Sequence, residues 1–361
     1  QETQSEKRKS MNSHSMALLA LLTMAGAVSS PAQTYTVTDL GVAAGDNQSL
    51  GGGMNGLGQA AGTSSNAANS SSGLATLFKN GQAISLGALA PSDESFASAI
   101  SDAGEVAGYD YLSTRQSASH AAIWSNGKIT DIHSDSLFPY GSDALGVNNA
   151  GTVVGYGWPD TADLHAFVYS NGKMVELGTF GGSNSLALAI NNSGQAVGWS
   201  LANSGVTHAF LYSNGEMRDL GVPSGASSST AIAISSNGEI LGEVQVGSNT
   251  EISRYSNGAW TELGTGVTGT VNTLAAGINS SGEIVGSGTF PGVYSPRKAR
   301  KPAVPIGFIY VGGVFVDLNT LIPSNSGFHI AAALAINDAG EILCNATNSI
   351  GQMHAALLTP R

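Results

Sequence analysis

One pattern of residues recurs seven times along this chain and constrains its fold more than any other feature. The first half of the pattern is clearest in 165–178, which reads His-Ala-Phe-Val-Tyr-Ser-Asn-Gly-Lys-Met-Val-Glu-Leu-Gly, and again in 208–221. The second half is clearest in 187–200, which reads Ala-Leu-Ala-Ile-Asn-Asn-Ser-Gly-Gln-Ala-Val-Gly-Trp-Ser. Such a repeat predicts an array of similar units that bury their apolar faces against one another.

Each half of the repeat has the sequence of a β-hairpin. In five copies of the first half an Asn-Gly pair separates two short apolar runs, and Gly312-Gly313 takes its place in a sixth. A two-residue type I′ turn needs positive φ at both central positions, and Asn and Gly adopt it at least cost. The 48 glycines and the 11% of charged residues also suit a turn-rich β protein. Each unit should therefore contain four short strands.

The second half of the repeat is present in seven copies. They recur at intervals of about 45 residues, the period of a four-stranded propeller blade, and the last interval is lengthened by an insertion at 288–305. The turn glycines of the seven copies align as Gly58, Gly104, Gly151, Gly194, Gly238, Gly282 and Gly340.

The two ends of the array each carry half a hairpin. Tyr35–Gly41 matches the strand after the Asn-Gly turn, and His354–Leu358 matches the strand before it. Pairing of these two segments would close the array into a ring and remove its exposed edges. We therefore predict an all-β, seven-bladed β-propeller of four-stranded blades, closed by pairing of 35–41 with 354–358. The alanine-rich strand is expected to be innermost and the Asp/Glu-Leu-Gly strand outermost.

The ordered motifs His-Ala-Phe, Ser-Asn-Gly, Leu-Gly and Ile-Asn-x-x-Gly resemble those of the bacterial HAF-repeat family of extracellular proteins. The resemblance covers nearly the whole chain from residue 33 onward. It is weaker where Leu74, Glu251 and Ile306 replace the histidine. The resemblance implies export and a repeat architecture, and it brings no catalytic residues.

The N-terminal segment has the features of a secretory signal. A basic cluster at 7–9 precedes an apolar run at 16–28, and small residues at 30–32 offer a cleavage site. We expect 1–32 to be a signal peptide with an N-terminal extension and 33–361 to be a single HAF-repeat propeller domain. After removal of the signal peptide the protein would be secreted to the cell exterior, with the periplasm as the alternative location. The apolar run is short for a membrane span, so no membrane insertion is expected after signal removal.

Charge and cysteine content exclude some classes of partner and of chemistry. The net charge of −11 at pH 7 argues against nucleic acid as a partner. Cys344 is alone, so no internal disulfide can form. It replaces the usual repeat glycine within a strand, which favours a buried thiol over a nucleophile. We expect a monomer stabilised by packing and ring closure.

Neither metal nor cofactor chemistry is predicted from the repeat. Equivalent histidines would be separated by a whole blade and could not converge on one ion, so they are expected to form structural hydrogen bonds. The Asn and Asp residues of the turns do not follow the spacing of a calcium loop. No catalytic residue, metal site or cofactor is assigned. The equivalent histidines are His120, His165, His208 and His354.

The irregular loops hold the candidate ligand-binding residues. They join the second strand of a blade to the third, or one blade to the next, so they should gather on one face of the ring. Aromatic side chains beside carboxylates can bind sugars, and functional residues concentrate on loops carried by a rigid scaffold. The candidates are Tyr111, Arg115, His133, Tyr140, Trp158, Asp160, Asp163 and Tyr294.

These features favour a binding or interaction scaffold for carbohydrate or another component of the cell envelope. One alternative is a propeller glycoside hydrolase or polysaccharide lyase, with the pair Asp160 and Asp163 or the pair Asp93 and Glu94 as its carboxylates. Another is a purely structural surface protein. The basic insertion at 288–305 is expected to project as a solvated loop, or to contact an anionic polymer or an envelope surface.

Overall fold

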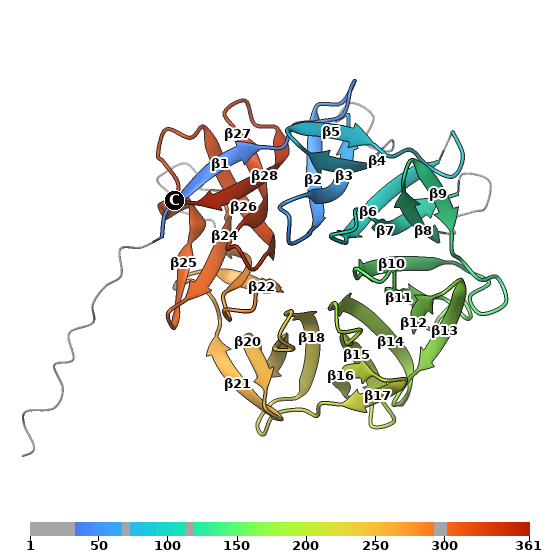
Figure 1. The fold of residues 1–361 in the computed structure, drawn as a ribbon. Coiled ribbons are helices and arrows are strands. Elements are labelled where there is room, and N and C mark those ends of the chain that lie inside the picture. Colours follow the sequence, from blue (N-terminus) through green and yellow to red (C-terminus); the bar gives the residue numbers. More distant parts are fainter. Residues whose placement is uncertain (1–32, 67–72, 92, 113–118, 292–301) are drawn as a thin grey trace, which may run out of the picture. The chain divides into compact units, whose positions relative to one another are not determined.

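The computed structural model describes residues 33–66, 73–91, 93–112, 119–291 and 302–361. Within it, Thr34–Arg361 forms one compact unit. This unit holds seven four-stranded antiparallel sheets arranged as blades around a common axis (Figure 1). The described residues contain no α-helix, and their single helical element is the 3-10 turn η1 (Leu318–Thr320). The predicted seven-bladed β-propeller is therefore confirmed.

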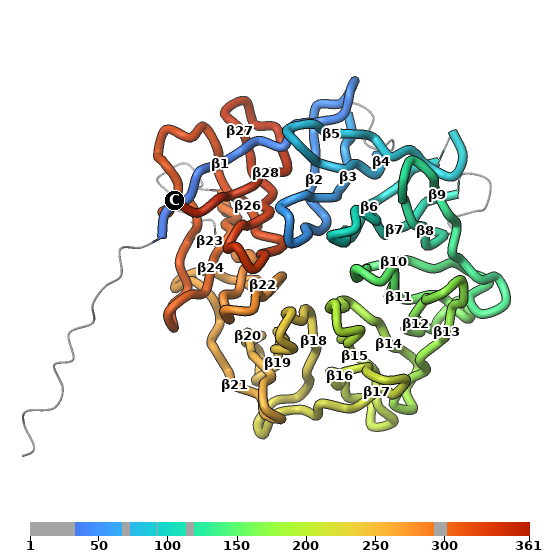
Figure 2. Tube along the Cα trace, viewed as in Figure 1, coloured from blue at the N-terminus to red at the C-terminus, as the bar shows by residue number. Residues whose placement is uncertain are grey.

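The chain visits the blades in sequence order, as the trace in Figure 2 shows. The first blade consists of β2 (Gln48–Met54), β3 (Ala60–Ser65), β4 (Leu74–Lys79) and β5 (Gln82–Ser85). The second consists of β6 (Glu94–Ile100), β7 (Val106–Tyr111), β8 (Ser119–Ser125) and β9 (Lys128–Asp131). The third consists of β10 (Ser142–Val147), β11 (Val153–Gly157), β12 (His165–Ser170) and β13 (Lys173–Gly178).

The next three blades have the same strand order. The fourth blade consists of β14 (Gly181–Ile190), β15 (Ala196–Ala202), β16 (Thr207–Ser213) and β17 (Glu216–Asp219). The fifth consists of β18 (Ser228–Ile234), β19 (Ile240–Val246), β20 (Asn249–Ser256) and β21 (Ala259–Gly264). The sixth consists of β22 (Val271–Ile278), β23 (Ile284–Phe290), β24 (Val304–Val311) and β25 (Val314–Asp317).

The seventh blade combines both ends of the described chain. Its strands are β26 (Phe328–Ile336), β27 (Ile342–Asn348), β28 (Met353–Pro360) and β1 (Tyr35–Asp39), with β1 outermost. β1 pairs antiparallel with β28 from Tyr35↔Pro360 to Asp39↔Ala356, and the Tyr35 ring is buried in the core cluster of this blade. The predicted closure is confirmed.

The Asn-Gly hairpins and the strand order within a blade are also as predicted. The five turn asparagines have φ between 52° and 54°, and the glycine that follows each of them is also at positive φ. These are the backbone angles of a type I′ turn. The alanine-rich strand is innermost in the blades, and the Asp/Glu-Leu-Gly strand is outermost.

The core lies between neighbouring blades. Phe167 and Phe210, from the His-Ala-Phe strands, are fully buried. Phe167 packs in one cluster with Ala107 and Ala121 of the preceding blade and with Ala144 of its own. Aromatic side chains therefore fill the space between blades, and each blade packs against its neighbours.

The channel wall is shaped by an irregularity that the innermost strands share. Each innermost strand contains a β-bulge, and the bulged residue falls between two positions of the regular ladder. Five of these bulged residues line one axial cavity: Gly52, Ser98, Leu145, Leu188 and Ile232. In three of the blades a larger apolar side chain therefore faces the channel.

Cys344 occupies a strand position at which other blades have glycine. At Gly198 a Cβ would lie 1.8 Å from the Leu186 carbonyl oxygen of the inner strand. Next to Cys344, β26 has a second bulge, between Ile330 and Ala332, beside the one shared with the other blades. Cys344 is fully buried, and burial raises the pKa of its thiol. The expectation of a buried thiol is confirmed.

Candidate functional site

The two ends of the channel are built differently. At one end, called the turn face here, lie the hairpin turns that join the first strand of a blade to the second and the third to the fourth. At the other end, called the loop face, lie the longer connections between the second and third strands and between successive blades. The chemistry of each end follows from the residues at those connections.

The turn face is dominated by the asparagine of the Ile-Asn-x-x-Gly motif. In the fourth blade, Asn191 Oδ1 accepts hydrogen bonds from the backbone N–H groups of Ser193 and Gln195. Its Nδ2 group donates to the carbonyl oxygen of Ser235 in the next blade, at 3.2 Å. One side chain thus shapes its own turn and joins it to the neighbouring turn.

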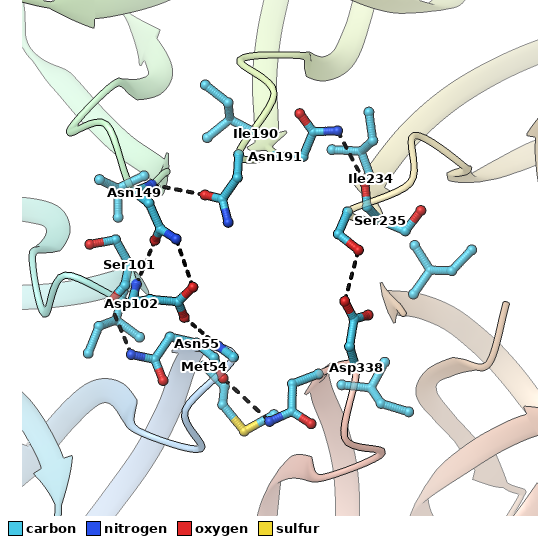
Figure 3. Close-up of a pocket in the computed structure, with 18 residues that line it drawn as sticks. Met54, Asn55, Ser101, Asp102, Asn149, Ile190, Asn191, Ile234, Ser235 and Asp338 are labelled. Carbon is cyan, nitrogen blue, oxygen red and sulfur yellow. Dashed lines mark hydrogen bonds between the residues drawn. The ribbon is translucent and has the colours of Figure 1, made fainter. Parts of the chain in front are cut away.

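Hydrogen bonds of this kind connect the blades all the way around the axis. Figure 3 shows the side chains around this end of the channel, where they line a cavity of about 240 Å³. None of the ring's asparagine atoms is among the buried side-chain atoms left without a hydrogen-bond partner in the described part of the chain. The bonds are Asn55 Nδ2 to Ser101 O, Asp102 N to Asn149 Oδ1, Asn148 Nδ2 to Asn191 O, Asn191 Nδ2 to Ser235 O, Asn237 Nδ2 to Ser280 O, Asn279 Nδ2 to Asn337 O and Asn337 Nδ2 to Asn55 O.

This arrangement, called the asparagine ring here, gives the Asn and Asp residues of the turns hydrogen-bond partners in the neighbouring blades. Their polar groups are used to hold neighbouring turns together, which suits a structural role for this end of the channel.

The repeat histidines form hydrogen bonds within their blades. In each case Nδ1 contacts the carboxylate of the Asp/Glu-Leu-Gly motif on the neighbouring outer strand, and in the closing blade this pair joins β28 to β1. The expected structural hydrogen-bonding role is confirmed. The pairs are His120–Asp131, His165–Glu176, His208–Asp219 and His354–Asp39.

Aromatic side chains gather on the loop face of the second and third blades. Phe96 and Tyr109 stack with ring centroids 5.2 Å apart, and Tyr111 packs edge-on against both. Tyr156 of the third blade packs edge-on against Trp158 at 5.1 Å. We call these five side chains the aromatic row. Phe96 and Tyr109 also line the axial cavity that contains the bulged leucines.

A buried carboxylate lies beneath the aromatic row. Asp143 accepts hydrogen bonds from the hydroxyl groups of Ser119 and Tyr156, the latter at 2.8 Å. Burial raises the pKa of Asp143, and these two hydrogen bonds oppose the shift. Burial also raises the pKa of Tyr156, and its neighbours Asp143, Tyr109 and Tyr111 add to that effect. The aromatic row therefore continues from the second blade to the third around one acidic group.

A second buried carboxylate, Asp110, lies in the same blade as Tyr109 and Tyr111. Its Oδ2 accepts the Leu89 N–H at 2.7 Å, and its Oδ1 is buried without a hydrogen-bond partner. Burial is the largest effect on this group and raises its pKa to about 6, while the Leu89 hydrogen bond opposes the shift and Asp93 adds to it.

Asp110 should make the protein more stable in mild acid. Its pKa in the folded state exceeds the usual value of 3.8, so the folded protein binds this proton more tightly than the unfolded chain does. The contribution of Asp110 to the free energy of unfolding should therefore rise as the pH falls from above 6 towards 4. Asp110→Asn should raise it by about 2 kcal/mol at pH 8 and by much less at pH 4.

Urea unfolding at both pH values would measure this difference. Glu216→Gln, on an exposed hairpin, is the control. Equal pH dependence of wild type and Asp110→Asn would show that Asp110 is not the group responsible.

The structure brings together only some of the residues chosen from the sequence. Tyr111 and Trp158 belong to the aromatic row, and Tyr140 is exposed on the loop whose backbone bonds to Trp158. The His133 side chain is buried against His120. Arg115, Tyr294 and most of the insertion at 288–305 lie outside the described residues, as does the expected signal peptide at 1–32.

Asp160 and Asp163 do not form a pair of free carboxylates. Asp160 Oδ1 accepts the backbone N–H groups of Ala162 and Asp163, both at 2.8 Å, which shapes the loop between β11 and β12. These backbone hydrogen bonds lower the pKa of Asp160. Asp160 thus has a structural role in this loop.

Sequence reasoning missed Phe96, Tyr109, Asp110, Asp143 and Tyr156, because it looked at loops whereas these residues lie on strands. One signal was available. The second strands of the second and third blades carry Tyr109-Asp110-Tyr111 and Tyr156-Gly157-Trp158 directly after their Val-Ala-Gly or Val-Val-Gly segments. Alternate aromatic residues at the loop-face end of neighbouring strands indicate a shared aromatic surface.

The fold and this surface define a β-propeller with an aromatic, carboxylate-containing loop face. No protein-family model matches the chain, and no curated protein does. Among solved structures, TolB from Acinetobacter baumannii is 12% identical with a TM-score of 0.47, over 83% of this chain and 63% of TolB. This chain therefore spans less than two thirds of TolB.

Two other solved structures have a similar degree of likeness. A gluconolactonase from Xanthomonas campestris is 10% identical with a TM-score of 0.40, over 90% of this chain and 89% of the enzyme. A mutant of the Aleuria aurantia lectin is 11% identical with a TM-score of 0.39, over 81% of this chain and 97% of the lectin. These values are too low to bear on function.

Proposed function

We propose that this protein binds carbohydrate on the loop face of its second and third blades. The observation that carries the proposal is the aromatic row of Phe96, Tyr109, Tyr111, Tyr156 and Trp158 beside the buried carboxylate of Asp143. The C–H faces of a sugar ring pack on aromatic rings, and sugar hydroxyl groups bond to tyrosine hydroxyls and carboxylates. The binding surface is carried by strands packed in the core, so it is largely preformed.

The carboxylates of this region favour binding over hydrolysis. A glycosidase needs two carboxyl groups that reach the substrate from either side of the bond to be cleaved. Asp110 and Asp143 are both buried, and Asp143 is held by Ser119 and Tyr156. Asp143 bonds to the hydroxyl group of Tyr156 and holds it at the edge of the row.

Tyr111 is the residue that tests the proposal with least effect on folding, because its side chain is exposed at the edge of the row. The mature chain 33–361 should bind at least one member of a glycan panel, and Tyr111→Ala should weaken that binding about tenfold. Leu57→Ala, at an exposed position on the turn face, should bind as the wild type does. Both variants should melt within about 2 °C of the wild type.

Calorimetric titration with the best glycan would measure these affinities. Absence of binding to the whole panel, or full affinity in Tyr111→Ala, would contradict the proposal. Release of reducing ends from a polysaccharide panel would favour the glycoside hydrolase or lyase instead.

We also propose that the protein is a monomeric, exported member of the HAF-repeat family. The support for family membership is the ordered set of motifs, and the support for export is the basic and apolar pattern of 1–32. In the part of the chain that the structure describes, no helix is both long and apolar enough to span a membrane. An envelope component rich in carbohydrate is the ligand that such an exported protein would meet.

A further inference from the structure

Two histidines and one carboxylate meet on the loop face of the second blade, apart from the aromatic row. The rings of His120 and His133 are stacked with centroids 3.9 Å apart. Their side chains are only 8% and 3% exposed. With Asp135 they offer three ligand atoms that lie within 4.8 Å of one another. His120 comes from β8, whereas His133 and Asp135 belong to the connection that leads to β10.

Both imidazoles are held through Nδ1. His120 Nδ1 is 2.8 Å from Asp131 Oδ2, and His133 Nδ1 is 2.7 Å from Ser142 Oγ. His120 donates its Nδ1–H to the Asp131 carboxylate, which leaves a lone pair on Nε2, and His133 has the same lone pair in the tautomer that donates to Ser142. Both Nε2 atoms are buried, and that of His133 lies 3.5 Å from Asp135 Oδ1. A buried nitrogen lone pair without a full hydrogen bond is unfavourable, and a ligand that accepts the lone pair removes that cost.

From this geometry we propose that His120, His133 and Asp135 bind a divalent transition-metal ion, with Zn²⁺ as the ion that fits the donors best. Two neutral imidazoles and a carboxylate are a common zinc donor set, and they leave a fourth position for water or another ligand. The contact of His120 with Asp131 is the carboxylate–histidine arrangement that orients such ligands. A shared ion requires the two rings to tilt out of their stacked arrangement until both Nε2 lone pairs point at it.

The other blades show why the site arises at this place. His165 and His208 have the same contact with an acidic residue, but Gly178 and Gly221 occupy the position of His133. Those glycines have φ of +73° and +71°, whereas His133 does not adopt positive φ. The backbone therefore turns differently after Asp131 and places a second imidazole on the first.

The burial of the two imidazoles and the exposure of Asp135 decide from which side an ion would approach the site. Asp135 is largely exposed and provides the side from which an ion can enter. A bound ion would tie the 132–141 connection, which carries Tyr140, to β8.

The test uses the chain 33–361 without an affinity tag, stripped with a chelator and titrated with Zn²⁺ alone. Calorimetry should give one zinc per chain with a micromolar or tighter Kd, and Co²⁺ should give the visible spectrum of a four-coordinate site. His133→Gly restores the residue of the other repeats, so it should fold normally and bind zinc at least 100-fold more weakly. His208→Ala, which removes an equivalent histidine in another blade, should bind zinc as the wild type does.

Wild-type protein that takes up no zinc, His133→Gly protein that keeps the wild-type affinity, or His208→Ala protein that loses it would each overturn the proposal. Circular dichroism of every variant checks that the fold is retained. Carbohydrate binding is measured separately with Tyr111→Ala, so a failure of either proposal leaves the other to be judged by its own result.

Discussion

Asn191→Ala should lower the free energy of unfolding by about 3 kcal/mol, although it removes only a small polar group. Asn191 Oδ1 accepts two backbone N–H groups of its own turn, and its Nδ2 donates to the Ser235 carbonyl of the next blade. The side chain is buried, so alanine would leave these partners short of hydrogen bonds in a place that water reaches poorly. Urea unfolding followed by fluorescence measures the change.

Ser193→Ala is the matched control for this prediction. Ser193 lies two residues further along the same turn and is exposed, so its substitution should change the free energy of unfolding by less than about 0.5 kcal/mol. Similar effects of the two variants would mean that the asparagine ring contributes no more than an ordinary surface turn.

A larger effect is expected from removing the strand that closes the ring. The chain 41–361 lacks β1, and with it the buried Tyr35 ring and five residue pairs with β28. The loss should cost about 5 kcal/mol or more, because a large buried side chain is removed and a strand edge is exposed. The chain 33–361 is the reference for thermal unfolding, and 41–361 should also aggregate more readily.

Adding the missing strand as a peptide distinguishes loss of ring closure from a general loss of folding in the truncated chain. A peptide of residues 33–41 added to the chain 41–361 should bind beside β28 and restore much of the lost stability. If 41–361 is as stable as 33–361 and binds no peptide, the terminal strand does not hold the ring together.

The sequence was sufficient to predict the blades, their number and their closure. The reason is that hairpin turns and half-repeats are local features, such as the Asn-Gly pairs and the segments Tyr35–Gly41 and His354–Leu358. The role of the repeat histidines could also be inferred, because equivalent positions cannot meet in a ring. The β-bulge in each inner strand was not foreseen, and it explains why Leu145, Leu188 and Ile232 line the channel in place of alanine.

The candidate site was only partly predictable, because it depends on contacts between blades. Tyr111 and Trp158 could be predicted because they lie near loops. Asp143 could not, because its place in the site depends on hydrogen bonds from Ser119 and Tyr156. The pairing of His133 with His120 escaped notice because His133 lies at the glycine position of the repeat, and only equivalent histidines were compared. A residue that departs from the repeat, as His133 does, can form a contact that the other blades lack.

Native-state hydrogen exchange of two matched amides tests the closed ring most directly. The Leu40 N–H donates to Ala355 O at 3.0 Å across the closing blade, and the Leu220 N–H donates to Ala209 O at 2.9 Å within a continuous blade. A closed ring predicts that the Leu40 amide is protected to within about tenfold of the Leu220 amide, since both would exchange through opening of a complete blade. Exchange of Leu40 at the rate of an unstructured peptide, with Leu220 still protected, would contradict it.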